Sequence, residues 1–145
     1  VMAAMQVFLE RLESAAVQEI YRGLDARWNA RAALLNERLR NADIPVQVAN
    51  FSTVWTVFYT KPSRYNWMFQ FYLRAEELAL SWVGTGRLIF SLNFSAADFE
   101  AVATRFVRAA QAMKEAGWWW DSPTLTDKSI RRGLLKEMLS QRFRK

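Results

Sequence analysis

The sequence predicts an α+β domain in which a mainly antiparallel sheet of roughly four strands is covered by helices. Two observations support this prediction. Helix-like and strand-like segments follow one another in the order α-α-β-β-α-β-β-α, and the strand-like segments occur in adjacent pairs, as hairpins do. Sheets of parallel strands need a crossover between one strand and the next instead. Beyond the domain, a basic helix forms a C-terminal tail.

Two helices are expected at the N-terminal end. The apolar side chains of the first share one face at helical spacing: Met2, Met5, Phe8, Leu9 and Leu12. Ser14 can cap a second, longer helix that runs to about Asn41 and ends before Pro45. The apolar stripe of this second helix keeps steps of four and seven residues: Ile20, Leu24, Trp28, Leu35 and Leu39.

Two strands are expected after Pro45. In VQVANF, Val46 and Val48 alternate with polar neighbours, and the following TVWTVFY is rich in β-branched and aromatic residues. The second of these strands is expected to be well buried. Pro62 and Ser63 then interrupt the strand pattern and introduce a helix.

This helix should run from about Tyr65 to Leu78 and is apolar on almost every side. Its large side chains point in all directions of a helical wheel: Trp67, Met68, Phe69, Phe71, Tyr72 and Leu73. A helix of this kind is covered on both sides. Together with the triple Trp118-Trp119-Trp120, it indicates more apolar surface than a small domain hides alone, so we expect a partner surface from the same protein or from another subunit.

A second hairpin is predicted by LALSWVGTGRLIFSL, in which two apolar segments flank Gly84-Thr85-Gly86. A phosphate-binding loop is the alternative for these glycines, but it needs a longer Gly-rich spacing followed by Lys at a helix start. Ser95 and Asp98 then predict the start of a long helix that stops at Gly117. Its apolar face is continuous: Phe99, Val102, Ala103, Phe106, Val107, Ala110 and Met113.

The composition is that of a globular protein, with 52% hydrophobic and 23% charged residues and a net charge of +6. The positive charge is concentrated at one end, because residues 128–145 carry seven Lys and Arg against Glu137 alone, whereas the preceding residues balance 13 against 13. A basic helical end is more often a solvated face or a docking helix than a phosphate-binding arm. We therefore expect no nucleic-acid partner, but a stand-alone interaction module whose arm binds nucleic acid or an acidic partner remains the alternative.

Cys and His are absent. Thiolate and imidazole metal sites, disulfides, Cys nucleophiles and Ser-His-Asp triads are therefore excluded within this sequence, and we expect no metal centre. No apolar run approaches the length that spans a bilayer, and no signal peptide is evident. We expect a cytoplasmic protein without a membrane partner.

Arg87 is the main candidate for a binding residue. It begins the apolar strand LIFSL, where an unpaired charge is costly to bury. A guanidinium group can hold a carboxylate through two parallel hydrogen bonds, which suits an amino acid or keto acid. The alternative is a residue at the rim of the sheet, paired with a nearby acid or lying along the edge.

The other ionisable residues favour no catalytic role. Glu76 and Glu77 lie at the end of the aromatic helix, where a solvated acidic patch is the simpler interpretation. None of the lysines lies in an apolar run that would lower its pKa: Lys61, Lys114, Lys128, Lys136 and Lys145. We therefore assign no catalytic residue within these 145 residues.

The stretch from IPVQVANF to TRFVRAA resembles the C-terminal small domain of class III, pyridoxal-phosphate-dependent aminotransferases, in the branch similar to glutamate-1-semialdehyde aminomutase. The resemblance extends from VMAAMQVFLERL to about Gly117. It includes VMAAM in the opening helix, then Arg87, the strand 88–92 and the acidic helix start 95–98. It implies a small domain over residues 1–117 with a helical lead-in over 1–41, followed by a linker over 118–127 and a basic tail helix over 128–145.

The resemblance also implies an activity. The parent enzyme would bind pyridoxal 5'-phosphate as a Schiff base on a Lys and move an amino group between a small-molecule amine and a carbonyl acceptor. In the family, that Lys and the other cofactor-binding residues lie in a domain N-terminal to Val1, so this chain would bind no cofactor covalently and would be inactive alone. The implied partners are this N-terminal cofactor domain and a second subunit in a homodimer.

Arg87 aligns with an arginine that grips the substrate carboxylate in many class III enzymes. The family often has a Pro-Pro pair after this arginine, where this sequence has Phe90-Ser91. The departure affects the expected strand geometry and carboxylate specificity.

Overall fold

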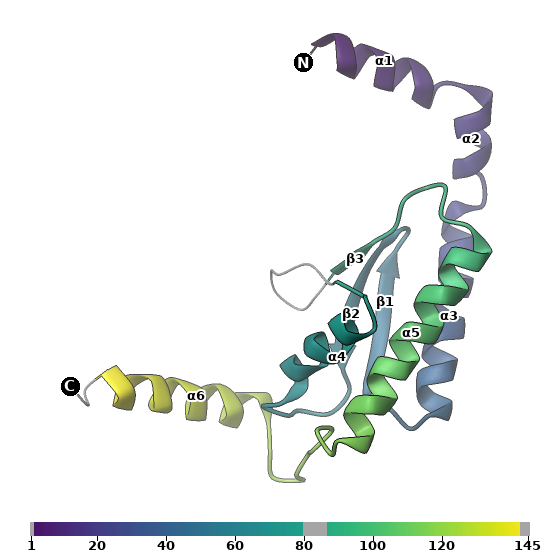
Figure 1. Cartoon of the computed structure of the whole chain (residues 1–145). Helices are drawn as coiled ribbons and strands as arrows, with labels where there is room; N and C mark the ends of the chain where they lie inside the picture. Colours follow the sequence, from purple (N-terminus) through teal and green to yellow (C-terminus); the bar gives the residue numbers. More distant parts are fainter. Residues whose placement is uncertain (1, 80–86, 143–145) are drawn as a thin grey trace.

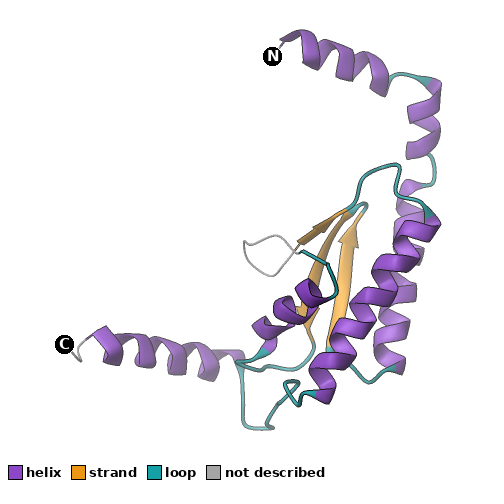
Figure 2. Ribbon diagram, viewed as in Figure 1, coloured by secondary structure: helices purple, strands orange, loops and turns teal. Residues whose placement is uncertain are grey.

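The computed structural model of the protein describes residues 2–79 and 87–142. Figures 1 and 2 show an antiparallel sheet with two long helices, α3 and α5, on one side and α4 beside them. This arrangement confirms the predicted α+β class. The described residues form three strands in the order β1-β2-β3: β1 (Val46–Phe51), β2 (Val54–Tyr59) and β3 (Arg87–Ile89). The strand expected just before Gly84 lies largely in residues 80–86, outside the described part.

The first two strands form the predicted hairpin. β1 and β2 pair along their whole length, from Val46 opposite Tyr59 to Phe51 opposite Val54. Burial alternates along both strands, because successive side chains of a strand point to opposite faces of the sheet. The prediction that the second strand is well buried is therefore right for its inner face only.

The expected single helix between Ser14 and Asn41 is divided in two, so that prediction is wrong. Ser14 caps a short helix, α2 (Ala15–Tyr21), through its hydroxyl and the backbone N–H of Val17. The chain then turns at Gly23, whose φ of 73° lies in the left-handed region, and continues as α3 (Leu24–Asn41). The periodic apolar stripe runs through this break, which hid it from the sequence pattern.

The aromatic helix is shorter than predicted. It begins with a 3₁₀ turn, η1 (Asn66–Met68), and continues as α4 (Phe69–Ala75). Phe69 and Leu73 are buried against α5 (Ala96–Glu115), whereas Trp67 and Phe71 are 68% and 66% exposed. The side of this helix that was expected to be covered is therefore bare in the single chain.

The predicted start of α5 is confirmed in detail. Ser95 accepts a hydrogen bond from the backbone N–H of Asp98, and the Asp98 carboxylate accepts one from the backbone N–H of Ser95. The Ser95 hydroxyl also donates to the Asp98 carboxylate at 2.7 Å, and this hydrogen bond, together with the one from the backbone N–H of Ser95, lowers the pKa of Asp98. The face of α5 that includes Ala103 and Phe106 is fully buried, as its periodicity indicates.

Aromatic rings from α3, from β2 and from the residue that follows β3 form the centre of the core. Trp28 of α3 stacks on Phe90 at 4.7 Å between ring centroids and meets Trp55 of β2 edge to face at 5.9 Å. The Arg31 guanidinium lies over the Trp28 ring at 4.5 Å, and its Nη2 donates to the carbonyl of Phe94. Phe90 is therefore a core residue.

Two helices project from opposite ends of this body (Figure 1). α1 (Met2–Leu12) continues beyond α2 at one end, and α6 (Asp127–Arg142) follows the loop after α5 at the other. None of the described side chains of α6 is buried. The helix begins one residue before the predicted start, and the last three residues of its predicted range, 143–145, lie outside the described part.

Candidate functional site

The face of the sheet that points away from α3 and α5, here called the outer face, carries large apolar side chains. Phe51, Val54, Phe58 and Ile89 alternate with the buried residues of the three strands and are 86%, 41%, 40% and 72% exposed. An apolar group of this kind on one face of a sheet marks a contact surface. The sequence also indicates this exposed apolar surface. In β2, large apolar residues occupy positions on the inward side of the strand, Trp55 and Val57, and on the outward side, Val54 and Phe58.

Arg87 lies on this outer face. It stands opposite Thr56 in the register of β3 with β2, and its side chain is exposed. With Thr56, Ala49, Phe51 and neighbouring residues it borders a shallow hollow of about 250 Å³. Among the described residues, no carboxylate forms an ion pair with Arg87.

This placement bears on both interpretations of Arg87. The Arg87 guanidinium forms no ion pair with an acid of the described chain, and the hollow that it borders also includes the apolar side chains of Phe51 and Val54. If another protein surface covered the outer face, water would be removed and a charge-assisted pair to a carboxylate would be strengthened. The geometry can thus hold a carboxylate at an apolar contact surface.

Glu76 and Glu77 do not join this site. They follow α4 and pair with arginines of α5: Glu76 with Arg108 at 2.9 Å, and Glu77 with Arg105. The two carboxylates therefore fasten α4 to α5.

The described lysines are also engaged or solvent-exposed. Lys61 Nζ lies 3.3 Å from the Asp121 carboxylate, and Lys114 Nζ lies 3.2 Å from that of Asp43. Lys128 and Lys136 are exposed on α6, and Lys145 lies outside the described residues. None of the four described lysines is enclosed in a way that would make its amine a nucleophile.

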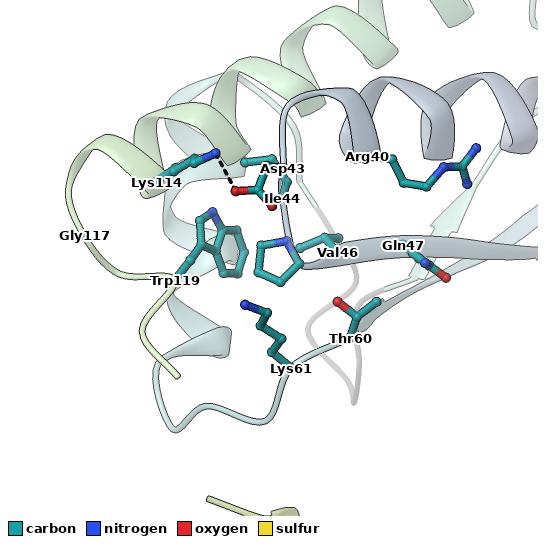
Figure 3. Close-up of a pocket in the computed structure, with 11 residues that line it drawn as sticks. Arg40, Asp43, Ile44, Val46, Gln47, Thr60, Lys61, Lys114, Gly117 and Trp119 are labelled. Carbon is teal, nitrogen blue, oxygen red and sulfur yellow. Dashed lines mark hydrogen bonds and ion pairs between the residues drawn. The ribbon is translucent and has the colours of Figure 1, made fainter. Parts of the chain in front are cut away.

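A larger hollow of about 420 Å³ lies at the other end of the sheet, where α3 and α5 end (Figure 3). Figure 3 shows Lys114 pointing at Asp43, with Trp119 and Lys61 on one side of the hollow and Arg40 on the other. Lys114 also donates to the carbonyl of Ala42 at 2.8 Å. Because the C-terminal ends of helices carry partial negative charge, these cations complement the helix ends. The two lysines around this hollow are already paired with carboxylates, and the hollow is therefore a weaker candidate for a binding site than the outer face.

The tryptophan triplet closes the core next to this hollow. Trp119 donates from Nε1 to the carbonyl of Ala110 at 2.9 Å and packs on Phe69. Trp118 contacts Tyr65, while Trp120 is half exposed. Trp118 and Trp119 therefore pack on the protein's own body, whereas the triplet was expected to add to the apolar surface that a partner covers.

In the described parts of the chain, no three acidic side chains come close enough to hold a metal ion. None of the helices in those parts combines the length and hydropathy that crossing a membrane requires.

No protein-family model matches the sequence, and no curated protein gives a significant match. Solved structures do resemble the fold. An omega-transaminase from Sphaerobacter thermophilus matches 72% of this chain with a TM-score of 0.57 and 17% identity. A beta-phenylalanine aminotransferase from Variovorax paradoxus matches 66% of this chain with a TM-score of 0.51 and 18% identity. The matched parts are 26% and 24% of those chains, so this chain has the fold of about a quarter of each enzyme.

Proposed function

We propose that this chain is the C-terminal portion of a pyridoxal-phosphate-dependent aminotransferase, in the class III branch similar to glutamate-1-semialdehyde aminomutase. Its role is to provide surface on the substrate side and at the contacts with the cofactor domain and a second subunit. The observation that supports this most directly is the shared fold with two aminotransferases, each about four times longer than the matched part. The sequence resemblance, which was identified from different features, agrees with it.

The residues described here do not fit the cofactor itself. Pyridoxal phosphate needs a Lys for the Schiff base and a polar partner for its ring nitrogen. The described lysines are paired with carboxylates or lie on the exposed helix α6. In the proposed enzyme these residues therefore do not hold the cofactor, and the resemblance to the family implies that a domain N-terminal to Val1 binds it.

The outer face is the proposed contact with that domain. In this proposal the cofactor domain covers the exposed apolar side chains of the outer face, Phe51, Phe58 and Ile89. Arg87 lies on the same face and binds the substrate carboxylate. The substrates are a small-molecule amine and a carbonyl acceptor, at least one of which carries a carboxylate in this proposal.

The test of this assignment uses the coding sequence upstream of Val1. A Lys-bearing cofactor domain is expected there, and the complete protein should transfer amino groups. In it, Arg87→Ala should raise the KM for carboxylate-bearing substrates and leave the KM for simple amines nearly unchanged. Arg40→Ala, which removes an exposed arginine at the other end of the sheet, is the matched control.

Two results would contradict the proposal. Absence of a cofactor domain upstream, or amino transfer by these 145 residues alone, would refute the assignment to the C-terminal portion of an aminotransferase. Equal losses for carboxylate and amine substrates in Arg87→Ala would refute the binding role of Arg87 and leave a structural one.

The contact surface can be tested on the 145-residue chain itself. A dye that fluoresces on exposed apolar surface should bind it, and the double substitution Phe51→Ser/Ile89→Ser should reduce the signal. Leu34→Ser, which removes an apolar side chain on the solvent side of α3, serves as the control. Equal signals from the double variant and the unchanged chain would exclude the outer face as the main exposed apolar surface.

A further inference from the structure

The hollow beside Arg87 owes its shape to the sizes of the side chains on the outer face. In the register of the sheet, Ala49 of β1, Thr56 of β2 and Arg87 of β3 lie side by side and form one row across the three strands, here called the small row. Side chains two residues apart along a strand point to the same face. The small row therefore has a neighbouring row of outer-face side chains on each side of it.

The neighbouring rows consist mainly of larger side chains. On one side, Phe51, Val54 and Ile89 stand opposite one another in the register. On the other side, Phe58 of β2 stands opposite Gln47 of β1. The small row is therefore the floor of a trough that crosses the strands and has a guanidinium group at its β3 end.

The hollow of about 250 Å³ lies in this trough, because its border includes all three residues of the small row together with Phe51 and Val54. Asn50 also borders the hollow, but its side-chain amide donates to Asn29 of α3 and to the carbonyl of Ser52. The trough thus combines apolar walls with one cationic end.

A ligand that fits the trough has two parts. A carboxylate suits the guanidinium of Arg87, which forms no ion pair with an acid of the described chain. An uncharged carbon chain suits the apolar walls, because a strongly polar group would lose its hydration there without gaining a partner. Adjacent strands lie about 4.8 Å apart, so the small row spans about 10 Å from β3 to β1. The carbon chain can therefore extend from the carboxylate across Thr56 toward Ala49.

We propose that the substrate whose carboxylate binds Arg87 carries an extended apolar chain, and that this chain lies in the trough. The inference rests on the proposed aminotransferase function and adds to it the chemical class of the substrate. In the assembled enzyme the cofactor domain contacts the larger side chains on both sides, and the trough between them stays open to the substrate. Ala49 is then a specificity-determining residue, because a larger side chain at this position would fill the trough.

The experiment uses the complete enzyme with its upstream cofactor domain. Straight-chain carboxylates without an amino group serve as competitive inhibitors. From propanoate through pentanoate to heptanoate, the inhibition constant should fall about threefold for each added CH2 group, because each group buries further apolar surface. The corresponding alcohols should inhibit much more weakly, and heptanoate should bind Arg87→Ala no better than heptanol does. Titration calorimetry with the same compounds measures the binding without turnover.

The decisive variant is Ala49→Leu. Because Ala49 is exposed on the outer face, leucine can be accommodated there without repacking of the core, and its side chain occupies the trough. The inhibition constant of heptanoate should rise about tenfold, whereas that of propanoate, which is too short to reach this position, should change by less than about twofold.

Two matched variants control for other effects of the substitution. Ala49→Ser keeps the side chain small and should preserve the dependence of the inhibition constant on chain length. Ala101→Leu makes the same change as Ala49→Leu at an exposed position of α5, and it should leave the inhibition constants of all three carboxylates unchanged.

The possible results distinguish this inference from the proposed function. Amino transfer with inhibition constants that do not depend on chain length would overturn the inference and leave the aminotransferase function in place. A dependence on chain length that Ala49→Leu reduces no more than Ala101→Leu would overturn it too, because the carbon chain would then lie elsewhere. Equal weakening of propanoate and heptanoate by Ala49→Leu would also overturn it, since the role of Ala49 would then be structural. A complete protein without amino transfer would refute both the function and the inference.

Discussion

Arg38 of α3 and Glu100 of α5 face each other across the two long helices and form two parallel hydrogen bonds, 2.7 Å from Nη1 to Oε1 and 2.9 Å from Nη2 to Oε2. The residues are 62 positions apart in the sequence. The pair links α3 to α5 at the solvent-exposed edge of the core. Its hydrogen bonds lower the pKa of Glu100 and raise that of Arg38.

This pair predicts a pH dependence of stability. Because the pKa of Glu100 is lower in the folded chain than its ordinary 4.5, the pair stabilises the fold above about pH 4.5. This contribution is lost as the pH falls through the folded-state pKa. Urea unfolding at pH 7, 5 and 3 should show that Glu100→Gln removes part of the acid sensitivity of the unchanged chain.

Glu115→Gln, near the end of the same helix, is the matched control because Glu115 forms no ion pair with the described residues. If both variants kept the full acid sensitivity, the Arg38–Glu100 pair would contribute nothing measurable.

Two phenylalanines near one another in the fold should respond very differently to truncation. Phe106 is fully buried and meets Phe69 edge to face at 5.1 Å between ring centroids, whereas Phe71 on the other side of α4 is mostly exposed. Phe106→Ala should lower the free energy of unfolding by about 3–5 kcal/mol. Phe71→Ala should change it by less than about 0.5 kcal/mol, because it leaves no cavity. Chemical denaturation of both variants checks this, and similar losses would contradict the packing described here.

Two glycines should give opposite effects when replaced by alanine. Gly117 ends α5 with a φ of 74°, and the N–H groups of Gly117 and Trp118 donate back to Lys114 and Met113. Gly117→Ala should destabilise the chain by about 1–2 kcal/mol, because L-residues are strained in this region. Gly133 lies inside α6 with open space around the position of an added Cβ, so Gly133→Ala should favour that helix by about 0.5–1 kcal/mol.

Thermal unfolding of the first variant and circular dichroism of the second provide the measurements. If Gly117→Ala stabilised the chain instead, the left-handed backbone conformation of Gly117 would be contradicted.

Tyr59 should ionise late. Burial raises its pKa to about 12, since the phenolate would lose its hydration beside Trp119. The neutral phenol therefore stabilises the fold fully below the unfolded value of about 10, and this contribution is lost as the pH rises toward 12. In an absorbance titration at alkaline pH, Tyr59→Phe should remove the step near pH 12. Tyr21→Phe, at an exposed position of α2, should leave it in place.

Periodicity and end signals in the sequence were sufficient to define most of the elements. The face of α5 and its start at Ser95 follow from helical spacing and local hydrogen bonding, which act over a few residues. The β1–β2 hairpin follows in the same way from alternation. The break between α2 and α3 at Gly23 was not predicted. The apolar residues keep helical spacing on both sides of it, so the sequence pattern gives no sign that the chain changes direction there.

Long-range pairings could be established only from the tertiary structure. Asn36 of α3 binds both the N–H and the C=O of Val48 at the free edge of β1, at 2.8 and 2.9 Å, where a neighbouring strand would otherwise pair. Nothing near Asn36 in the sequence indicates this contact. Likewise, the sequence singled out Arg87 by its position in an apolar strand, but its place among Phe51, Phe58 and Ile89 on the bare face depends on the sheet register.

The sequence by itself determined the fold class, the capping of the helices and the location of the excess positive charge, because these depend on residue type and short spacing. The tertiary structure decided which apolar surfaces remain uncovered: the outer face of the sheet, one side of α4, and the projecting helices α1 and α6. Exposure is a property of everything packed around a side chain, and those neighbours come from distant parts of the chain.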